Sequence, residues 1–333
     1  MGGTGADRPP TPERPVKVLV TGASGLLGRS VALALSARGD QVTVFQRRPS
    51  GLDCGQLLGD VADLAAVTAA CEGQEAVVHL AARVSVTGRW ADFARTNVTG
   101  TAHVLDAARG ARVRAVVHVS SPSVAHTGRS IVGQGAAPAD PDRAQGHYAR
   151  SKAVAERLAL AAPGLKVAAV RPHLVWGPGD TQLVGRILAR ARAGRLALVG
   201  PGTALVDTTY VDNAVDAIVA CLDRAEQVAG RAFVVSNGQP RPLAELVQRI
   251  CAAGGVAAPR RHIPYPIARA GGALAELAWA GLHRSDDPPM TRFLAEQLAT
   301  AHWFDLRQTR SALGWSPRID LDEGFHRLAA SSS

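Results

Sequence analysis

The chain has 333 residues, which suffices for one large α/β domain or for a cofactor domain with a smaller lobe. The formal net charge of +9 comes from scattered, often single arginines without a basic run interleaved with aromatic residues, so we expect no nucleic-acid partner. Its four cysteines lie far apart with no C-x-x-C pair, so we expect neither a metal site nor disulfides, and a reduced, cytoplasmic setting.

The first half of the chain alternates short apolar strands with helices. Residues 1–14 are rich in Gly, Pro and Thr and lack an apolar core, which predicts a disordered tail and not a signal peptide. We predict strands at 16–21, 41–45, 76–80, 115–120 and 166–171, helices at 25–37, 61–70, 97–108 and 148–161, and a loop at 128–146. This succession implies right-handed crossovers and an α/β fold with a doubly wound parallel sheet.

Beyond residue 175 the regular alternation ends. Helical patterns at 183–193, 212–222, 242–251 and 289–298, with a short strand at 233–236, predict a smaller C-terminal lobe. We therefore expect a cofactor-binding domain over 15–175 and, over 176–330, mainly a substrate-binding lobe interleaved with the last strands of the sheet. The stretch 267–282 is too short and too polar to span a bilayer. We expect it to cap an apolar pocket, with membrane contact peripheral at most.

The turn between the first strand and the first helix carries a G-x-x-G-x-x-G loop, TGASGLLG. Glycine allows a tight turn and close backbone approach, and the following helix N-terminus attracts a pyrophosphate. In a run of strand–helix units this loop predicts a dinucleotide site. The residues that we expect to contact the cofactor here are Gly22, Ser24, Gly25, Leu26, Leu27 and Gly28.

The end of the second strand distinguishes between the two nicotinamide cofactors. An NAD-preferring fold usually carries an acidic residue there for the ribose 2′-hydroxyl, whereas this chain has Arg47 and Arg48. Two arginines can pair with a 2′-phosphate, so we expect NADP(H) in preference to NAD(H), the alternative being that they are solvated loop residues. Order along the chain further places Asp60 and Val61 near the adenine and the small residues after the fourth strand along the cofactor. That last group comprises Leu80, Ala81 and Ala82.

The reaction chemistry is suggested by one tyrosine and one lysine. The chain has three tyrosines and three lysines, yet Tyr148 precedes Lys152 by four residues, which is one helical turn. A nearby ammonium favours the phenolate and lowers the pKa of tyrosine, so Tyr148 can exchange a proton with a substrate oxygen. The strand at 115–120 leads into Ser121, whose hydroxyl is expected at the carboxyl edge of the sheet, where ligands of such folds bind. The alternative for the pair is an ordinary helix surface.

The segments TGASGLLG, HLAA, VSSPSV, YARSKAVAE and RPHLVWGPGD, in that order, resemble the extended short-chain dehydrogenase/reductase family. The resemblance implies a Rossmann fold, a dimer through paired helices, and a triad of Ser121, Tyr148 and Lys152, of which Tyr148 and Lys152 also contact cofactor. It further implies that Asn97 supports the cofactor and active site. The segment packing against the nicotinamide would include Pro172, Leu174 and Val175, while His173 either faces substrate or packs in the loop.

Similarity continues through LVDTTYVDNAVDA, MTRFLAEQLATAHWFD and LGWSPRIDLDEG to about residue 330. These segments resemble the 3β-hydroxysteroid dehydrogenase branch, and within it the bacterial 2-alkyl-3-oxoalkanoate reductases of olefin biosynthesis. The resemblance implies NADPH-dependent reduction of a 3-oxo group on a lipophilic small molecule. Three alternatives remain open: a steroid or sterol 3-hydroxyl dehydrogenase, a sugar-nucleotide epimerase or dehydratase, and a protein that binds NADP without turnover.

Overall fold

The computed structural model describes residues 14–85, 87–126, 128–282 and 288–332, so most of the predicted tail lies outside the described residues. Its centre is a sheet of seven strands, all parallel, in the order β12-β7-β5-β4-β1-β2-β3. The strands are β1 (Lys17–Thr21), β2 (Gln41–Gln46), β3 (Gly55–Leu58), β4 (Ala76–His79), β5 (Ala115–Val119), β7 (Lys166–Pro172) and β12 (Ala232–Val235). The order reverses at β1, which confirms the predicted doubly wound sheet.

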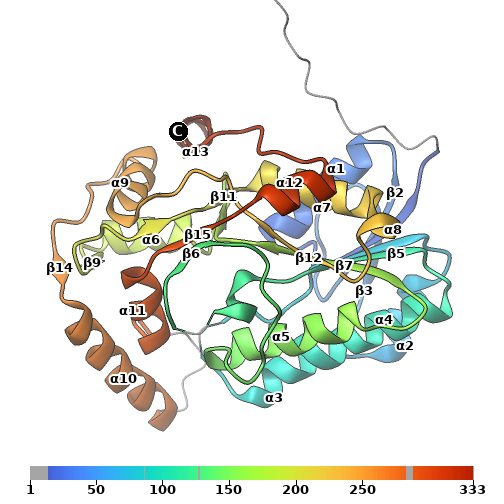
Figure 1. The fold of residues 1–333 in the computed structure, drawn as a ribbon, viewed down its shortest axis with the longest axis horizontal. Coiled ribbons are helices and arrows are strands. Elements are labelled where there is room, and N and C mark those ends of the chain that lie inside the picture. The colour runs from blue at the N-terminus through green and yellow to red at the C-terminus, as the bar shows by residue number, and fades with distance from the viewer. Residues whose placement is uncertain (1–13, 86, 127, 283–287, 333) are drawn as a thin grey trace, which may run out of the picture.

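Helices cover both faces of this sheet (Figure 1). One layer holds α1 (Leu26–Ala37), α7 (Val211–Asp223), α8 (Ala225–Val228) and α12 (Arg307–Leu313), and the other holds α2 (Leu64–Cys71), α4 (Gly100–Gly110) and α5 (Gly146–Leu160). A hydrophobic core lies on each face of the sheet, and alternate residues of β1 belong to different cores. Val18 and Val20 pack on the side of α1, whereas Leu19 packs on the side of α2 and α4. A strand buried on both faces explains why its sequence is apolar throughout.

Several predicted elements differ from the structure. The helix expected at 97–108 begins earlier, with α3 (Trp90–Phe93), and reaches α4 through a π-helical segment, Ala94–Thr99. The helix expected at 61–70 begins at Leu64, because the carboxylate of Asp63 accepts hydrogen bonds from the amides of Ala65 and Ala66 and so caps it. The loop expected at 128–146 contains a strand, β6 (Ile131–Gln134), which pairs with β15 (His302–Phe304).

The remaining elements form a smaller C-terminal lobe beside the sheet (Figure 1). Its helices are α6 (Val184–Arg192), α9 (Leu243–Ala253), α10 (Tyr265–Gly281), α11 (Arg292–Ala299) and α13 (Leu321–Ser332). Its short strands are β8 (Val175–Trp176), β9 (Leu198–Val199), β10 (Leu205–Val206), β11 (Thr209–Tyr210), β13 (Arg241–Pro242) and β14 (His262–Ile263), and a 3-10 turn, Pro122–Ala125, follows β5. The helix expected from residue 289 begins instead at Arg292, where the hydroxyl of Thr291 caps it.

The stretch expected to cap a pocket forms most of α10, which packs against α11. Its outer face exposes Ile267, Leu274 and Leu277. Within the described ranges no helix combines the length and the apolarity needed to cross a membrane.

Candidate active site

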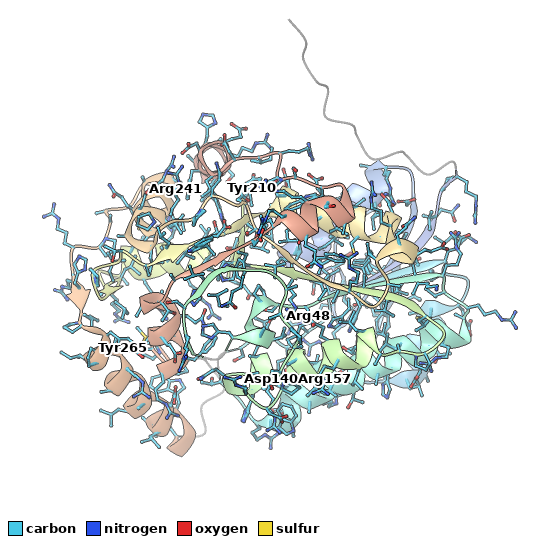
Figure 2. The ribbon with its side chains drawn as sticks, in the orientation of Figure 1. Arg48, Asp140, Arg157, Tyr210, Arg241 and Tyr265 are labelled. Atoms are coloured by element: carbon cyan, nitrogen blue, oxygen red, sulfur yellow. The ribbon has the colours of Figure 1, made fainter. Side chains whose placement is uncertain are left out.

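A cavity of about 1660 Å³ runs from the glycine loop along the carboxyl ends of the parallel strands and into the C-terminal lobe. All the predicted catalytic and cofactor-binding residues except Asn97 line it. Side chains from segments far apart in sequence thus meet at one edge of the sheet. Figure 2 labels Arg48 near the middle of the molecule and Tyr265 at the start of α10 on its left side. No residue of α10 lines the cavity, so the expectation that this helix caps it is wrong; its partner α11 does so instead.

The glycine loop is closed by two positions where a side chain does not fit. Gly22 has φ +80°, and a Cβ there would lie 2.8 Å from the amide nitrogen of Ala81. A Cβ on Gly28 would lie 2.4 Å from the carbonyl oxygen of Gly22, so α1 packs directly on the loop. Gly25 is the N-cap of α1 and no side chain caps this helix end. An uncapped helix N-terminus in the cavity wall suits a pyrophosphate, so these residues fit the dinucleotide that the motif implies.

The far end of the cofactor groove is basic. Arg47 and Arg48 follow β2, are exposed, and line the cavity. Asp60 lines the same region and is paired with Arg95, with an Nη2–Oδ2 distance of 3.0 Å. Burial raises the pKa of Asp60, but the amide of Ala62 and the charges of Arg95 and Arg47 outweigh it, so the pKa lies below its usual value. Asp60 is therefore an anion engaged by arginines, which leaves the groove positive overall.

Tyr148 lies in the first turn of α5, and its hydroxyl is hydrogen-bonded to the side chain of Ser121. Ser121 in turn accepts from Ser123, from the amide at 3.2 Å and from the hydroxyl at 2.9 Å. Burial raises the pKa of Tyr148, and the Ser121 hydrogen bond opposes this rise. The sequence predicted that Lys152 lowers this pKa. In the structure the influence that lowers the pKa of Tyr148 is the hydrogen bond with Ser121.

Lys152 lies one turn further along α5, with only 3% of its surface exposed. Its Nζ donates a hydrogen bond to the carbonyl oxygen of Val119 at 2.6 Å. Burial lowers the pKa of Lys152 to about 8, although the carboxylate of Glu156 opposes this effect. Glu156 is held in turn by Arg171, whose Nε donates to Oε2 at 2.8 Å, and both side chains are almost fully buried. The pKa of Lys152 therefore lies close to neutral pH, and the carboxylate of Glu156 is held in place one helical turn further along α5.

Asn97 lies behind the cavity wall and does not line it. Its Nδ2 donates to Ser151 Oγ at 2.8 Å, and its Oδ1 accepts from the amide of Arg83 at 2.7 Å. Ser151 in turn donates to the carbonyl oxygen of Tyr148 at 2.8 Å. The π-helical segment directs Asn97 toward α5. Asn97 thus positions the helix that carries Tyr148, and its expected direct contact with cofactor has no support in this geometry.

His173 is a packed loop residue. It is 8% exposed, its Nδ1 donates to the carbonyl oxygen of Asp207 at 2.5 Å, and its ring packs edge-on against Phe304 with centroids 4.9 Å apart. It does not line the cavity, whereas its neighbours Pro172 and Leu174 do. Of the two alternatives for His173, the structure supports packing.

The residues that sequence reasoning missed come from the C-terminal lobe. They line the cavity from the side of the lobe and are chiefly apolar, with a few polar side chains. They include Gln182, Leu183, Arg186, Ile187, Arg190, Leu198, Val199, Leu243, Val247, Met290, Leu294, Gln297, Leu298 and His302. The helical pattern at 183–193 was visible, but its orientation toward the cavity was not. Within the part of the chain that the structure describes, no cluster of His, Cys, Asp and Glu could hold a metal ion.

Comparison with known proteins agrees with this geometry. Residues 18–236 match the model of the NAD dependent epimerase/dehydratase family. The chain belongs to this family. Among its curated relatives, a 2-alkyl-3-oxoalkanoate reductase from Stenotrophomonas maltophilia is 41% identical over 96% of this chain and 100% of the relative. A 3 beta-hydroxysteroid dehydrogenase/Delta 5-->4-isomerase from Mycobacterium tuberculosis is 31% identical over 93% of this chain and 88% of the relative.

A solved structure, MoeE5 in complex with UDP-glucose and NAD, superimposes with a TM-score of 0.74 at 25% identity, covering 95% of this chain and 98% of MoeE5. Family membership and the reductase-named relatives identify the chain as an NAD(P)-dependent oxidoreductase that acts on a small molecule. The resemblance read from the sequence is thereby confirmed, and the relatives named as steroid dehydrogenases are more distant than those named as 2-alkyl-3-oxoalkanoate reductases.

Proposed function

We propose that the protein reduces the 3-oxo group of a 2-alkyl-3-oxoalkanoate to the 3-hydroxy acid with NADPH. The observation that carries the proposal is the cavity that holds the hydrogen-bonded Ser121 and Tyr148 and is lined by both the glycine loop and apolar residues of the lobe. This arrangement suits a cofactor on one side and a lipophilic chain on the other. The 41% identical relative named for this reaction, covered over its whole length, supports the same substrate class.

In the proposed reaction, bound NADPH supplies the hydride that reaches C3 of the substrate. Ser121 donates a hydrogen bond to the 3-oxo oxygen and holds it beside the Tyr148 hydroxyl. Tyr148 transfers its proton to that oxygen as negative charge develops there, which gives the 3-hydroxyl group. The ammonium of Lys152, on the same face of α5, stabilises the phenolate that remains until solvent returns a proton.

The preference for NADPH is part of the proposal, because the groove beyond β2 presents Arg47 and Arg48. Replacing both by alanine should raise KM for NADPH by about 10- to 100-fold, since two charge-assisted contacts to the 2′-phosphate are lost. KM for NADH should change less than threefold, since NADH has no 2′-phosphate. Equal effects on the two cofactors would contradict the assignment.

The main test follows NADPH oxidation at 340 nm with 2-alkyl-3-oxoalkanoates of several chain lengths. Tyr148→Phe should lower kcat by at least about 100-fold, because the proton donor is removed. The Kd for NADPH, from nucleotide fluorescence, should stay within about threefold. Undiminished turnover would disprove the role of Tyr148, and no turnover by the wild type at any chain length would disprove the substrate assignment.

A 3β-hydroxysteroid dehydrogenase is the second candidate, favoured by the 31% identity to a relative of that name. Steroid-dependent reduction of NADP⁺ or NAD⁺ faster than oxidation of a 2-alkyl-3-hydroxyalkanoate would select it. We further propose a cytoplasmic homodimer with at most peripheral membrane contact, built from a cofactor domain over 15–175 and a substrate lobe over 176–330. Light scattering of the pure protein tests whether it is a homodimer. Fractionation of cells tests whether it is cytoplasmic or associated with membranes.

A further inference from the structure

Three buried polar atoms on one face of β5 have no hydrogen-bond partner among the residues that the structure describes. They are Nδ1 and Nε2 of His118 and Oγ of Ser120. His118 and Ser120 follow Val116 at intervals of two residues, so all three side chains lie on the face of the sheet that α2, α4 and α5 cover. Because burying an unpaired polar atom is unfavourable, these atoms indicate a binding site for a small polar molecule.

The adjacent histidine on β4 has partners for both of its ring nitrogens. His79 lies opposite His118 in the register of the two strands, and their ring centroids are 5.5 Å apart. Its Nδ1 lies 2.8 Å from Thr21 Oγ1, and its Nε2 lies 3.0 Å from Thr101 Oγ1. The Thr101 hydroxyl donates its own hydrogen to the carbonyl oxygen of Asn97, so it accepts the hydrogen on His79 Nε2. His79 therefore has a structural role, whereas the nitrogens of His118 remain to be explained.

The ammonium of Lys152 lies beside these atoms. Its hydrogen bond to the carbonyl oxygen of Val119, the residue between His118 and Ser120, uses one of three N–H donors. Burial lowers the pKa of His118 well below its usual value, and the charge of Lys152 lowers it further. His118 is therefore neutral and has one nitrogen that can only accept a hydrogen bond. The cavity reaches Val119, Ser120 and Lys152, so water has access to this place.

The other ionisable groups around Lys152 already have partners or are neutral. On α5, the carboxylate of Glu156 is bound to Arg171 of β7, and the hydroxyl of Tyr148 is hydrogen-bonded to Ser121. On β4, burial lowers the pKa of His79 to about 3, and the charge of Lys152 adds to this effect, so His79 carries no charge. The unpaired atoms of His118 and Ser120 are thus the acceptors that remain for the lysine on the sheet side.

We propose that His118 and Ser120 bind a buried water molecule against the ammonium of Lys152 and so keep this lysine charged in the protein interior. The water accepts a hydrogen bond from Lys152 and donates to the bare nitrogen of His118 and to Ser120 Oγ, which gives the three bonds usual for a buried water. The inference deepens the proposed function, in which the ammonium stabilises the Tyr148 phenolate. His118 does not line the cavity, so it is a positioning residue that acts through Lys152.

The titration of Lys152 can be followed directly, because the chain has only three lysines. Protein labelled with carbon-13 at lysine Cε gives NMR signals from Lys17, Lys152 and Lys166, and Lys152→Met identifies the buried lysine. The exposed Lys17 and Lys166 serve as internal references. Without cofactor, the Lys152 signal of the wild type should titrate with a midpoint near pH 8. His118→Leu should lower this midpoint by about one pH unit, because the ammonium loses a hydrogen-bonded water.

Three further variants separate loss of the water from disturbance of the core. His118→Gln keeps a side-chain acceptor and should leave the Lys152 midpoint within about 0.3 pH unit of the wild type. His79→Leu is the matched control, because it makes the same substitution on the adjacent strand at a histidine that both threonines already satisfy. It should leave the midpoint unchanged. Ser120→Ala removes only a hydroxyl and should lower the midpoint by about half a pH unit, which keeps the test open if His118→Leu does not fold.

The inference is overturned if the Lys152 midpoint stays constant in His118→Leu and Ser120→Ala, or if it falls equally in His79→Leu. A crystal structure with no water within hydrogen-bond distance of both His118 and Lys152 would also overturn it. These measurements need no substrate, so they are independent of the proposed reaction. If the protein turns over no 2-alkyl-3-oxoalkanoate but the midpoint falls in His118→Leu, the proposed function fails and the water site stands.

If turnover is observed, the same substitution gives a kinetic signature. The pH at which kcat/KM falls on the alkaline side should move down in His118→Leu by the same amount as the NMR midpoint of Lys152, and His118→Gln should restore it. A profile that does not move, despite a shifted midpoint, would show that catalysis does not need the charge that His118 preserves.

Discussion

Replacing Lys152 by methionine should change how the stability of the protein depends on pH. Lys152 is 3% exposed and has a pKa of about 8, because burial disfavours its ammonium form. The unfolded chain retains the ordinary pKa near 10.5. The difference corresponds to about 3 kcal/mol of native-state stability that is lost when the lysine is charged. Methionine fills similar volume without a charge.

The sign follows from proton counting. Below pH 8 both states hold the proton, and the native state carries the full cost of the buried ammonium. Between pH 8 and 10.5 the native state has released the proton while the unfolded chain still binds it, so the free energy of unfolding rises with pH. Between about pH 7.5 and 9.5 the wild type should therefore gain roughly 2 kcal/mol relative to Lys152→Met.

Urea unfolding of wild type and variant at the two pH values, without cofactor, measures this gain. The lost hydrogen bond to Val119 shifts the variant equally at both pH values, so it cancels from the comparison. Lys166→Met is the control, because it makes the same substitution at an exposed position at the start of β7. A difference between wild type and Lys152→Met that stays constant with pH would refute the reasoning.

Three further changes test other parts of the site. Gly28→Ala should lower cofactor affinity at least about 10-fold in fluorescence titration, because its Cβ would meet the Gly22 carbonyl at 2.4 Å; Gly110→Ala, with open space around it, should not. Arg171→Met should cost about 3–5 kcal/mol in urea unfolding, because it leaves Glu156 charged and buried, and adding Glu156→Leu should recover part of the loss. Asn97→Ala should lower kcat and leave KM for NADPH nearly unchanged, because α5 loses the hydrogen bond from Asn97 to Ser151. A rise in KM for NADPH as large as the fall in kcat would indicate that Asn97 contacts the cofactor directly.

The elements predicted best from sequence are those whose cause is local. The glycine loop is recognised from the spacing of its glycines, with Gly28 packed on the loop itself, and the Tyr148–Lys152 pair follows from helical spacing, so both can be read from their own segment of chain. The buried strands could be predicted equally well from the sequence, because a strand covered on both faces is apolar throughout. The glycine loop and the Tyr148–Lys152 pair meet at the carboxyl edge of the sheet because the strands that lead to them are parallel.

What sequence reasoning missed depends on distant contacts. The hydrophobic periodicity of the sequence does not predict the π-helical segment that directs Asn97 to Ser151. The pairing of β6 with β15 joins residues about 170 positions apart, so it cannot be predicted from either segment alone. The helix at α6 was predictable, but which of its faces meets the cavity depends on its packing against α9. Helical spacing predicts that Lys152 lies near Tyr148, but it does not predict the hydrogen bond between Tyr148 and Ser121.

Strand β12 completes the sheet at the far side of β7, pairing Ala232 with Ala169 and Val235 with Pro172. It enters the sheet only after α6 and α7 have been made, about 60 residues later in the chain. At a synthesis rate of about 5–20 residues per second, the outer edge of β7 waits several seconds for its partner. During that time its free amides and carbonyls can pair with another nascent chain. This open edge of β7 should therefore contribute to chaperone demand and inclusion-body formation during overexpression, and a fragment truncated at residue 175 would keep it open permanently.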